Sequence, residues 1–227
     1  MDQERQRIVV ATHNKGKVAE IERILTSVLG PQDQRFEFVT SGELGLPDPV
    51  EDGVTFSQNA LIKARDAAAR SGLPAMADDS GLIVDVMGKA PGILSARWSG
   101  KHGDDAANNA LLLKQLADIP DRHRGARFCC ACALVLPAQT GGSDSQELVE
   151  EGRMVGRIIR QPRGQQGFGY DPLFVPDDQS LVTEEQKRAN QGLPLTSAQM
   201  TAEQKNAISH RGAAIRAMVA HFREVFR

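Results

Sequence analysis

The sequence lacks any apolar run approaching the roughly 20 residues that a membrane-spanning helix needs. It begins with a polar stretch, Met1–Arg7, which is not typical of a secretory signal peptide. Its three cysteines, Cys129, Cys130 and Cys132, are too few and too close together for a disulfide framework, and they are interpreted as small core residues. These absences predict a cytoplasmic protein with no membrane partner.

An excess of charge of either sign is also lacking. The net charge is -2, from 27 basic and 29 acidic residues, so no broad attraction to nucleic acid is expected. With 227 residues, of which 41% are hydrophobic, the chain can bury a sizeable core. One domain of two lobes and two separate domains both fit this length.

What is present begins with an acidic pair, Asp78-Asp79, between the apolar runs Leu73–Ala77 and Leu82–Val86. This pattern predicts two strands that meet at an acidic turn. Two ionised carboxylates beside buried chain repel each other, so they need a cation or several hydrogen-bond donors nearby. A plain surface turn is the alternative, because Asp, Ser and Gly are ordinary turn residues.

The N-terminal region predicts a strand at Ile8–Thr12, a polar loop at Thr12–Lys17, and a helix through Val18–Val28. A loop that leads into a helix N-terminus offers free backbone N–H groups and a positive dipole end, which together suit an anion. Lys15 and Lys17 add positive charge. A capped helix start with two solvated lysines is the alternative, since the Walker spacing is absent.

A capping box, Thr55-x-x-Gln58, predicts the start of an Ala-rich helix from Phe56 to about Arg70. Lys63 on this helix is either a surface residue or a phosphate contact, and the surface interpretation is favoured from the local pattern alone. Further strands are expected at Phe36–Thr40, Arg127–Leu136, Leu148–Glu151 and Met154–Ile159, and further helices at Asp104–Leu116 and from Ile208 to Val225.

A Gly-rich loop carries the single tyrosine of the chain, within Phe168-Gly169-Tyr170-Asp171. An aromatic pair in such a loop indicates either a stacking platform for a planar ligand or core packing. Further along, Ser209-His210-Arg211 stands at the start of the last helix. Cations are unfavourable at a helix N-terminus unless they meet an anion or acceptor, so this run favours a ligand site.

Taken together, five stretches resemble the inosine/xanthosine triphosphate pyrophosphatase family. They are Thr12-His13-Asn14-Lys15-Gly16-Lys17, Glu51–Phe56 with Asn59–Lys63, Ala77–Leu82, Gly167–Pro172 and Ile208–Arg211. The resemblance covers nearly the whole chain. It implies an α/β fold with a long, bent mixed sheet flanked by helices. It also implies one domain over residues 1–227, with two lobes and a central cleft, and a homodimer.

The resemblance further implies the reaction NTP + H2O → NMP + pyrophosphate, with Mg2+, on non-canonical purine nucleotides such as ITP, dITP and XTP. Glu51 and Asp79, with or without Asp78, would bind Mg2+, and Asp79 would accept a proton. The remaining residues would bind substrate. They are Thr12, His13, Asn14, Lys15, Gly16, Lys17 and Lys63 on the triphosphate, Ser80, and Phe168, Gly169, Tyr170, Asp171, Lys205, His210 and Arg211 around the base.

The family pattern is not matched everywhere. Gln58 stands where the family commonly has Glu, and the Pro176–Met200 segment is longer than usual. Thr183–Lys187 nearly repeats Thr201–Lys205, and Lys205 is chosen for the base pocket because it lies five residues before His210. A pyrophosphatase for another modified nucleotide, and a non-catalytic nucleotide- or RNA-binding module, are the alternative functions.

Overall fold

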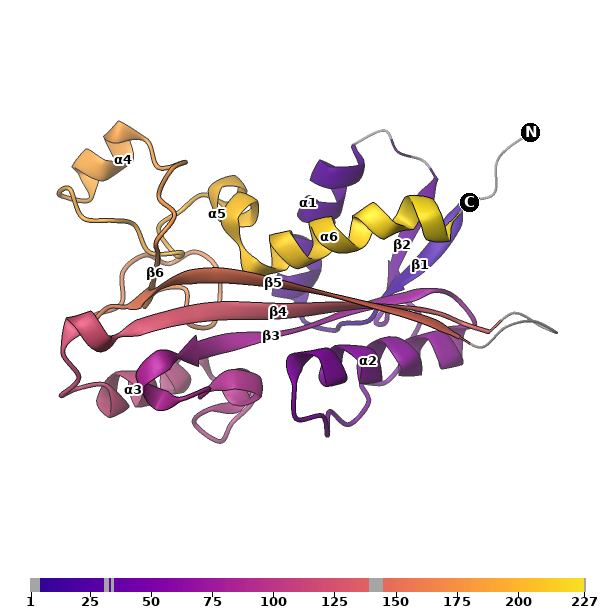
Figure 1. The fold of residues 1–227 in the computed structure, drawn as a ribbon, viewed down its shortest axis with the longest axis horizontal. Coiled ribbons are helices and arrows are strands. Elements are labelled where there is room, and N and C mark those ends of the chain that lie inside the picture. The colour runs from indigo at the N-terminus through magenta and orange to yellow at the C-terminus, as the bar shows by residue number, and fades with distance from the viewer. Residues whose placement is uncertain (1–4, 31–32, 34, 139–144, 227) are drawn as a thin grey trace. The chain divides into compact units, whose positions relative to one another are not determined.

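The computed structural model describes residues 5–30, 33, 35–138 and 145–226. Its strands form one six-stranded sheet in the order β2-β1-β3-β4-β5-β6 (Figure 1). The strands are β1 Gln6–Val10, β2 Phe36–Thr40, β3 Ala75–Val84, β4 Gly125–Leu136, β5 Gln146–Ile158 and β6 Phe174–Pro176. Because β1 pairs in parallel with β2 and β5 pairs antiparallel with β6, the sheet is mixed.

Helices flank this sheet and confirm the expected α/β class. The α-helices are α1 Lys15–Leu29, α2 Phe56–Ser71, α3 Asp105–Gln115, α4 Glu184–Ala189, α5 Ala202–Ile208 and α6 His210–Val225. Short 3-10 helices span Asp85–Met87, Gly92–Arg97 and Asp121–His123. Within the described ranges, no helix combines the length and the apolar character needed to cross a bilayer.

The chain divides into two compact units, and β3, β4 and β5 contribute residues to both. Unit 1 comprises residues 1–79, 130–152 and 211–227, and unit 2 comprises residues 80–129 and 153–210. In unit 1, helices α1 and α6 bury apolar side chains with Met76 and Cys132. The alanines of α2 pack with Ala75, Ala77 and neighbouring small residues of β4 in a second cluster. Unit 1 therefore has a core on each face of its part of the sheet.

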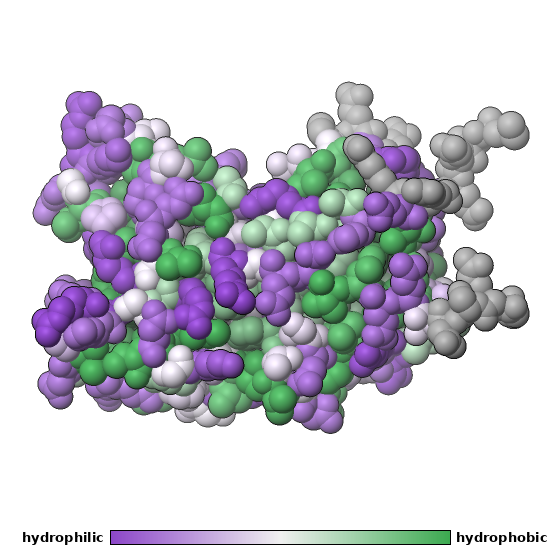
Figure 2. Space-filling model, in the orientation of Figure 1, coloured by the Kyte–Doolittle hydropathy of each residue, from purple (hydrophilic) through white to green (hydrophobic). Residues whose placement is uncertain are grey.

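Unit 2 has its own core, in which Leu112 of α3 and Leu116, the residue that caps the C-terminus of α3, pack with apolar residues of β3, β4 and β5. The ring of Phe128 lies edge-on to that of Phe174, with centroids 4.8 Å apart. Figure 2 shows one face of the molecule, where hydrophobic residues are broken up by hydrophilic ones.

The acidic turn predicted at Asp78-Asp79 is wrong, because β3 runs without a break from Ala75 to Val84. Leu148–Glu151 and Met154–Ile159 likewise belong largely to one strand, β5, rather than to two. The predicted capping box at Thr55 forms only in part. The Thr55 side chain accepts from the Gln58 N–H, but the Gln58 side chain accepts from the Val54 N–H. The cysteine interpretation is confirmed for Cys130 and Cys132, which are buried.

Candidate active site

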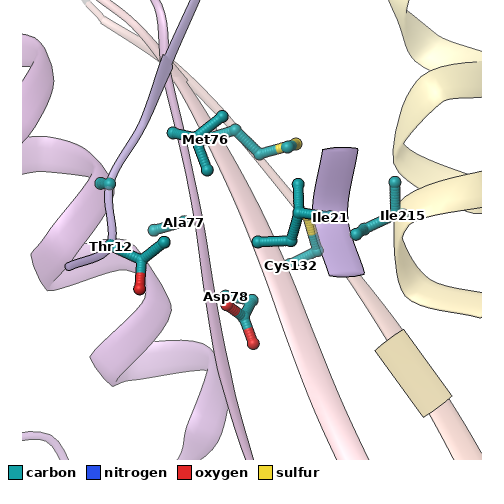
Figure 3. A pocket seen from close by; sticks show the side chains of 9 residues that line it. Thr12, Ile21, Met76, Ala77, Asp78, Cys132 and Ile215 are labelled. Atoms are coloured by element: carbon teal, nitrogen blue, oxygen red, sulfur yellow. The ribbon is translucent and has the colours of Figure 1, made fainter. Parts of the chain in front are cut away.

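Asp78 and Asp79 point to opposite faces of β3, as successive residues of a strand must. Met76 shares the face of Asp78 and packs with Ile21 and Ile215, whereas Ala77 belongs to the cluster formed with α2. Figure 3 shows these opposite directions for Met76 and Ala77, in a pocket that Asp78 also lines. The acidic pair therefore supplies one carboxylate to each of two environments within unit 1.

Asp78 lies in a buried ion-pair network. Its Oδ2 atom is 3.3 Å from Lys17 Nζ and 3.1 Å from Arg211 Nε, and the Arg211 guanidinium also binds Glu20. Burial alone would raise the pKa of Asp78, but the positive charges of Arg211, Lys17 and Lys63 outweigh it and hold that pKa well below its ordinary value. Asp78 is therefore a permanently ionised anchor for two cations.

Arg211 is almost completely buried, at 1% exposure, and its guanidinium donates to the carboxylates of Glu20 and Asp78. The structure thus satisfies the cation at the start of α6 with anions of the chain itself. This answers the electrostatic anomaly noted in the sequence. A direct contact between Arg211 and a base stays a prediction.

Asp79 lies in a second group of charges, with Lys63 between it and Glu51. Lys63 Nζ is 3.1 Å from Glu51 Oε1 and 3.5 Å from Asp79 Oδ1, and the Asn59 amide donates to Asp79 Oδ2 at 3.2 Å. Burial raises the pKa of Asp79, and the charge of Lys63 only partly offsets that. The surface interpretation of Lys63 is wrong, because this lysine is 8% exposed and ion-paired.

The donor set around Lys63 fits Mg2+. Glu51 and Asp79 each present a carboxylate oxygen to the same ammonium, so the two carboxylates converge on one cation. Mg2+ is typically held by one or two carboxylates while it keeps water and phosphate ligands. Among the described residues, no group of three or more His, Cys, Asp or Glu side chains forms a self-sufficient metal site.

The Thr12–Lys17 loop is organised by its own side chains. Asn14 caps α1 by accepting from the Lys17 N–H at 3.1 Å, and Thr12 Oγ1 accepts from the Asn14 N–H at 3.2 Å. His13 Nδ1 is 2.6 Å from Asp48 Oδ1. Gly16 is exposed in the first turn of α1, and the side chain of Lys15 lies outside the described part of the chain. The loop is a capped helix start whose second lysine pairs with Asp78 rather than lying free in solvent.

A separate group of predicted residues lies in unit 2, around the loop 167–171. Asp171 Oδ2 accepts from the Phe168 N–H at 3.0 Å and from Lys205 Nζ at 2.6 Å. Lys205 Nζ also lies 5.1 Å from the centroid of the Phe168 ring. The structure therefore brings together an aromatic face, a carboxylate and an ammonium, which is a suitable chemistry for a flat polar ring.

Tyr170, by contrast, is a core residue at 3% exposure, and its hydroxyl donates to the Ser95 carbonyl at 2.9 Å. Between the two interpretations of the aromatic pair, core packing holds for Tyr170. His210 is also buried, with its ring stacked on Phe128 at 4.9 Å between centroids. Ser80 lies half-buried in β3, immediately after Asp79.

The two lysines of the near-repeat, Lys187 and Lys205, lie in different environments. Lys187 is partly exposed and pairs with Glu184 on its own short helix, whereas Lys205 is buried against Asp171. The two repeats contact each other directly through reciprocal amide hydrogen bonds between Gln186 and Gln204. The structure is consistent with the choice of Lys205 for the base group.

Two residues with site contacts received no role from the sequence. Asn59 is one turn before Lys63 on α2, and that spacing of four could have placed both on one helix face. Glu20 lies three residues after Lys17 on α1, but its partner Arg211 is 191 positions away in the sequence. No local pattern could indicate that pairing.

Comparison with known proteins identifies the family of the chain. Residues 8–221 match the model of the Ham1 family. The chain is similar to the dITP/XTP pyrophosphatase of Bifidobacterium longum subsp. infantis, with 56% identity covering 93% of this chain and 96% of the relative. It is also similar in structure to the Mycobacterium abscessus nucleoside-triphosphatase / dITP/XTP pyrophosphatase (48% identity, TM-score 0.68, covering 95% and 98% of the two chains).

The structure of a HAM1 protein from Coxiella burnetii is a further neighbour, with 37% identity and a TM-score of 0.76 over 96% of this chain and 99% of the other. Family match, sequence relatives and structural neighbours all extend over nearly the whole chain. The resemblance noted in the sequence is thereby confirmed, and the chain belongs to the Ham1 family.

Proposed function

We propose that the chain hydrolyses non-canonical purine nucleoside triphosphates, namely ITP, dITP and XTP, to the monophosphate and pyrophosphate. The observation that carries the proposal is the convergence of Glu51 and Asp79 on Lys63, next to a strand whose other aspartate anchors Lys17. Carboxylates and lysines gathered in this way suit a metal-assisted reaction at a phosphate chain. The names of the relatives support the same reaction.

Glu51 and Asp79 would hold Mg2+ in this reaction. When bound, the ion neutralises phosphate charge and makes a bound water more acidic. Lys63, which pairs with both carboxylates in this structure, would bind phosphate oxygens of the substrate. Asp79 is better placed than Asp78 to bind Mg2+, because Asp78 is already paired with Arg211 and Lys17.

Asp79 would accept the proton of the water that attacks the α-phosphorus. The bond from that phosphorus to the bridging oxygen then breaks, and pyrophosphate leaves. The Asn59 hydrogen bond fixes one oxygen of Asp79 and leaves the other toward Lys63. Lys17, Lys63 and the backbone N–H groups of the Thr12–Lys17 loop would bind the triphosphate oxygens.

Lys205, Phe168 and Asp171 would recognise the base. Hypoxanthine and xanthine carry an acceptor oxygen at C6, which can meet the Lys205 ammonium, whereas adenine carries an amino group there. Donor would then face donor, and a buried unsatisfied pair is heavily penalised. His210, Ser80 and Arg211 are also proposed to bind the substrate. We further propose that the protein is a homodimer and is located in the cytoplasm.

Product analysis tests the proposal. ITP, XTP, ATP and GTP are incubated with the protein, with and without Mg2+, and pyrophosphate is resolved from orthophosphate. We expect metal-dependent IMP and pyrophosphate from ITP, with ATP nearly untouched. GTP carries the same C6 oxygen as ITP, so its rate measures discrimination at C2 separately. Orthophosphate and IDP would contradict the cleavage position, and an absence of turnover with all of the nucleotides would contradict the enzymatic function.

A further inference from the structure

Helix α3 holds both polar groups of the Gly169 main chain. Asp105 Oδ2 accepts from the Gly169 N–H at 2.6 Å, and Asn109 Nδ2 donates to the Gly169 carbonyl at 2.9 Å. Asp105 and Asn109 are four residues apart and therefore project from the same face of the helix. Two side chains of one helix thus hold the N–H and the carbonyl of a single glycine in the base-recognition loop.

These two hydrogen bonds act at one of the two glycines of the loop 167–171 that have a positive φ. Gly169 has φ +61°, in the left-handed region that most residues avoid. Phe168 precedes Gly169, and the Phe168 N–H donates to the carboxylate of Asp171, which follows two residues after Gly169. A rotation of the Gly169 peptide would therefore move the aromatic face and the carboxylate that partners Lys205 together.

Asn109 lowers the stability of the folded state through one buried polar atom, so good packing alone does not explain an asparagine at this position. Its Oδ1 atom is buried without a hydrogen-bond partner among the described residues. An apolar side chain of similar size would avoid this desolvation penalty. Unsatisfied polar groups of this kind are expected where a residue serves function rather than stability.

The next residue of the loop is anchored separately. The Tyr170 hydroxyl donates to the Ser95 carbonyl, and Ser95 Oγ accepts from the Leu82 N–H at 2.9 Å. Because these bonds already fix the C-terminal side of the loop, the contacts from α3 add control over the peptide that carries Phe168. The role of α3 is thus distinct from that of the Tyr170 anchor.

The geometry points to Asp105 and Asn109 as positioning residues that set base selectivity by fixing the Gly169 peptide. This inference rests on the proposed function of the loop. Neither side chain is required to touch the substrate. Their effect is transmitted through the positions of Phe168 and Asp171.

Two isosteric substitutions give opposite expectations. Asp105→Asn keeps an oxygen that can accept from the Gly169 N–H, so the ratio of kcat/KM for ITP to that for ATP should stay within about twofold of wild type. Asn109→Asp replaces the donor with a carboxylate that repels the Gly169 carbonyl. That variant should lose about tenfold in the ratio, mainly through a higher KM for ITP.

A stronger variant, Asp105→Ala, removes the acceptor altogether and should also lose about tenfold in selectivity. Its matched control is Asp104→Ala, which removes a carboxylate from the same helix start. Asp104 caps α3 by accepting from the Ala107 N–H, whereas the hydrogen bonds to Gly169 come from Asp105 and Asn109. The control should lower the melting temperature but leave the selectivity ratio unchanged.

Calorimetric binding of IMP provides a readout independent of turnover. We expect weaker IMP binding in Asn109→Asp and Asp105→Ala, and wild-type binding in Asp105→Asn. Wild-type selectivity and IMP binding in both weakened variants would overturn the inference, as would an equal loss in Asp104→Ala. A wild-type protein that hydrolyses no ITP would instead contradict the proposed function, so the two failures are distinguishable.

Discussion

The two groups of site residues are held in place by different forces. In unit 1, Asp78 and Asp79 are surrounded by charged side chains, and ion pairs to Arg211, Lys17 and Lys63 dominate. In unit 2, the loop 167–171 is held mainly by hydrogen bonds to its main chain, with one ion pair. The first arrangement suits chemistry on phosphates, and the second suits recognition of a shape.

This difference predicts that substitutions in the two groups will have different kinetic effects. Substitutions at the Asp79 group should lower turnover of every nucleotide by a similar factor. Substitutions at the loop should change the ratio between nucleotides while the chemical step is preserved. Each prediction below tests one side of that contrast.

The largest expected effect is on turnover. Asp79→Asn keeps the size of the side chain but removes the proposed base and a proposed metal ligand, so kcat should fall by roughly a thousandfold. Substrate binding and the ITP to ATP selectivity should be retained. Steady-state kinetics with equilibrium ITP binding measure both, and a kcat close to wild type would refute the role of Asp79.

Arg211→Ala should cost the most stability. It leaves the buried carboxylates of Glu20 and Asp78 without their shared cation, a loss of about 3–5 kcal/mol in the free energy of unfolding. The matched control is Arg65→Ala, which breaks a partly exposed pair with Glu147 and should cost at most about 1 kcal/mol. Urea denaturation compares the two variants.

The same Arg211→Ala variant also tests the predicted base contact. If Arg211 touches the base, selectivity for ITP over ATP should fall in the variant under conditions where it is folded. An unchanged ratio would assign Arg211 to the Asp78 network alone and place discrimination elsewhere.

The two lysines of the near-repeat form a natural pair for the loop. Lys205→Met should reduce the ITP to ATP selectivity by roughly 10-fold or more, because a charged hydrogen bond to the base is lost. Lys187→Met removes a partly exposed lysine from the same sequence context and should change neither selectivity nor stability measurably. Equal effects of the two substitutions would contradict the assignment of Lys205.

The smallest effects are expected for alanine substitutions at two glycines of the loop, Gly167 and Gly169. Both have positive φ, +78° at Gly167 and +61° at Gly169, so alanine at either position costs about 1 kcal/mol in backbone strain. A Cβ at Gly167 would also lie 2.1 Å from Asp171 Oδ2, whereas one at Gly169 meets nothing within 4 Å. Gly167→Ala should therefore impair ITP binding, and Gly169→Ala should mainly lower the melting temperature.

Local patterns predicted the elements whose signals are local. The strand Phe36–Thr40 matches β2, and the helix expected from Asp104 begins at Asp105 with Asp104 as its cap. The turn at Asp78 failed because its charges are satisfied by a partner 133 residues away, which a local window cannot see. Lys63 was misplaced for the same reason, since the carboxylates that bury it come from other segments.

The candidate site was predictable as a set of motifs but not as an arrangement. The resemblance named most of the residues that the structure gathers around Asp79 and Lys205. It did not show that Tyr170 serves the core or that Asn59, Asp105 and Asn109 support the site. Those contacts depend on side-chain directions that are fixed only when helix and strand pack.

The alternation along β3 also bears on how the chain reaches its folded state. A pairing shifted by one residue would still present an aspartate to each face, so the charges alone would not penalise the error. It would, however, drive Met76 in among the alanines beside α2 and leave an alanine in the place between Ile21 and Ile215. The alternation of methionine and alanine is thus the part of this strand that determines which aspartate lies beside Lys63 as the proposed base.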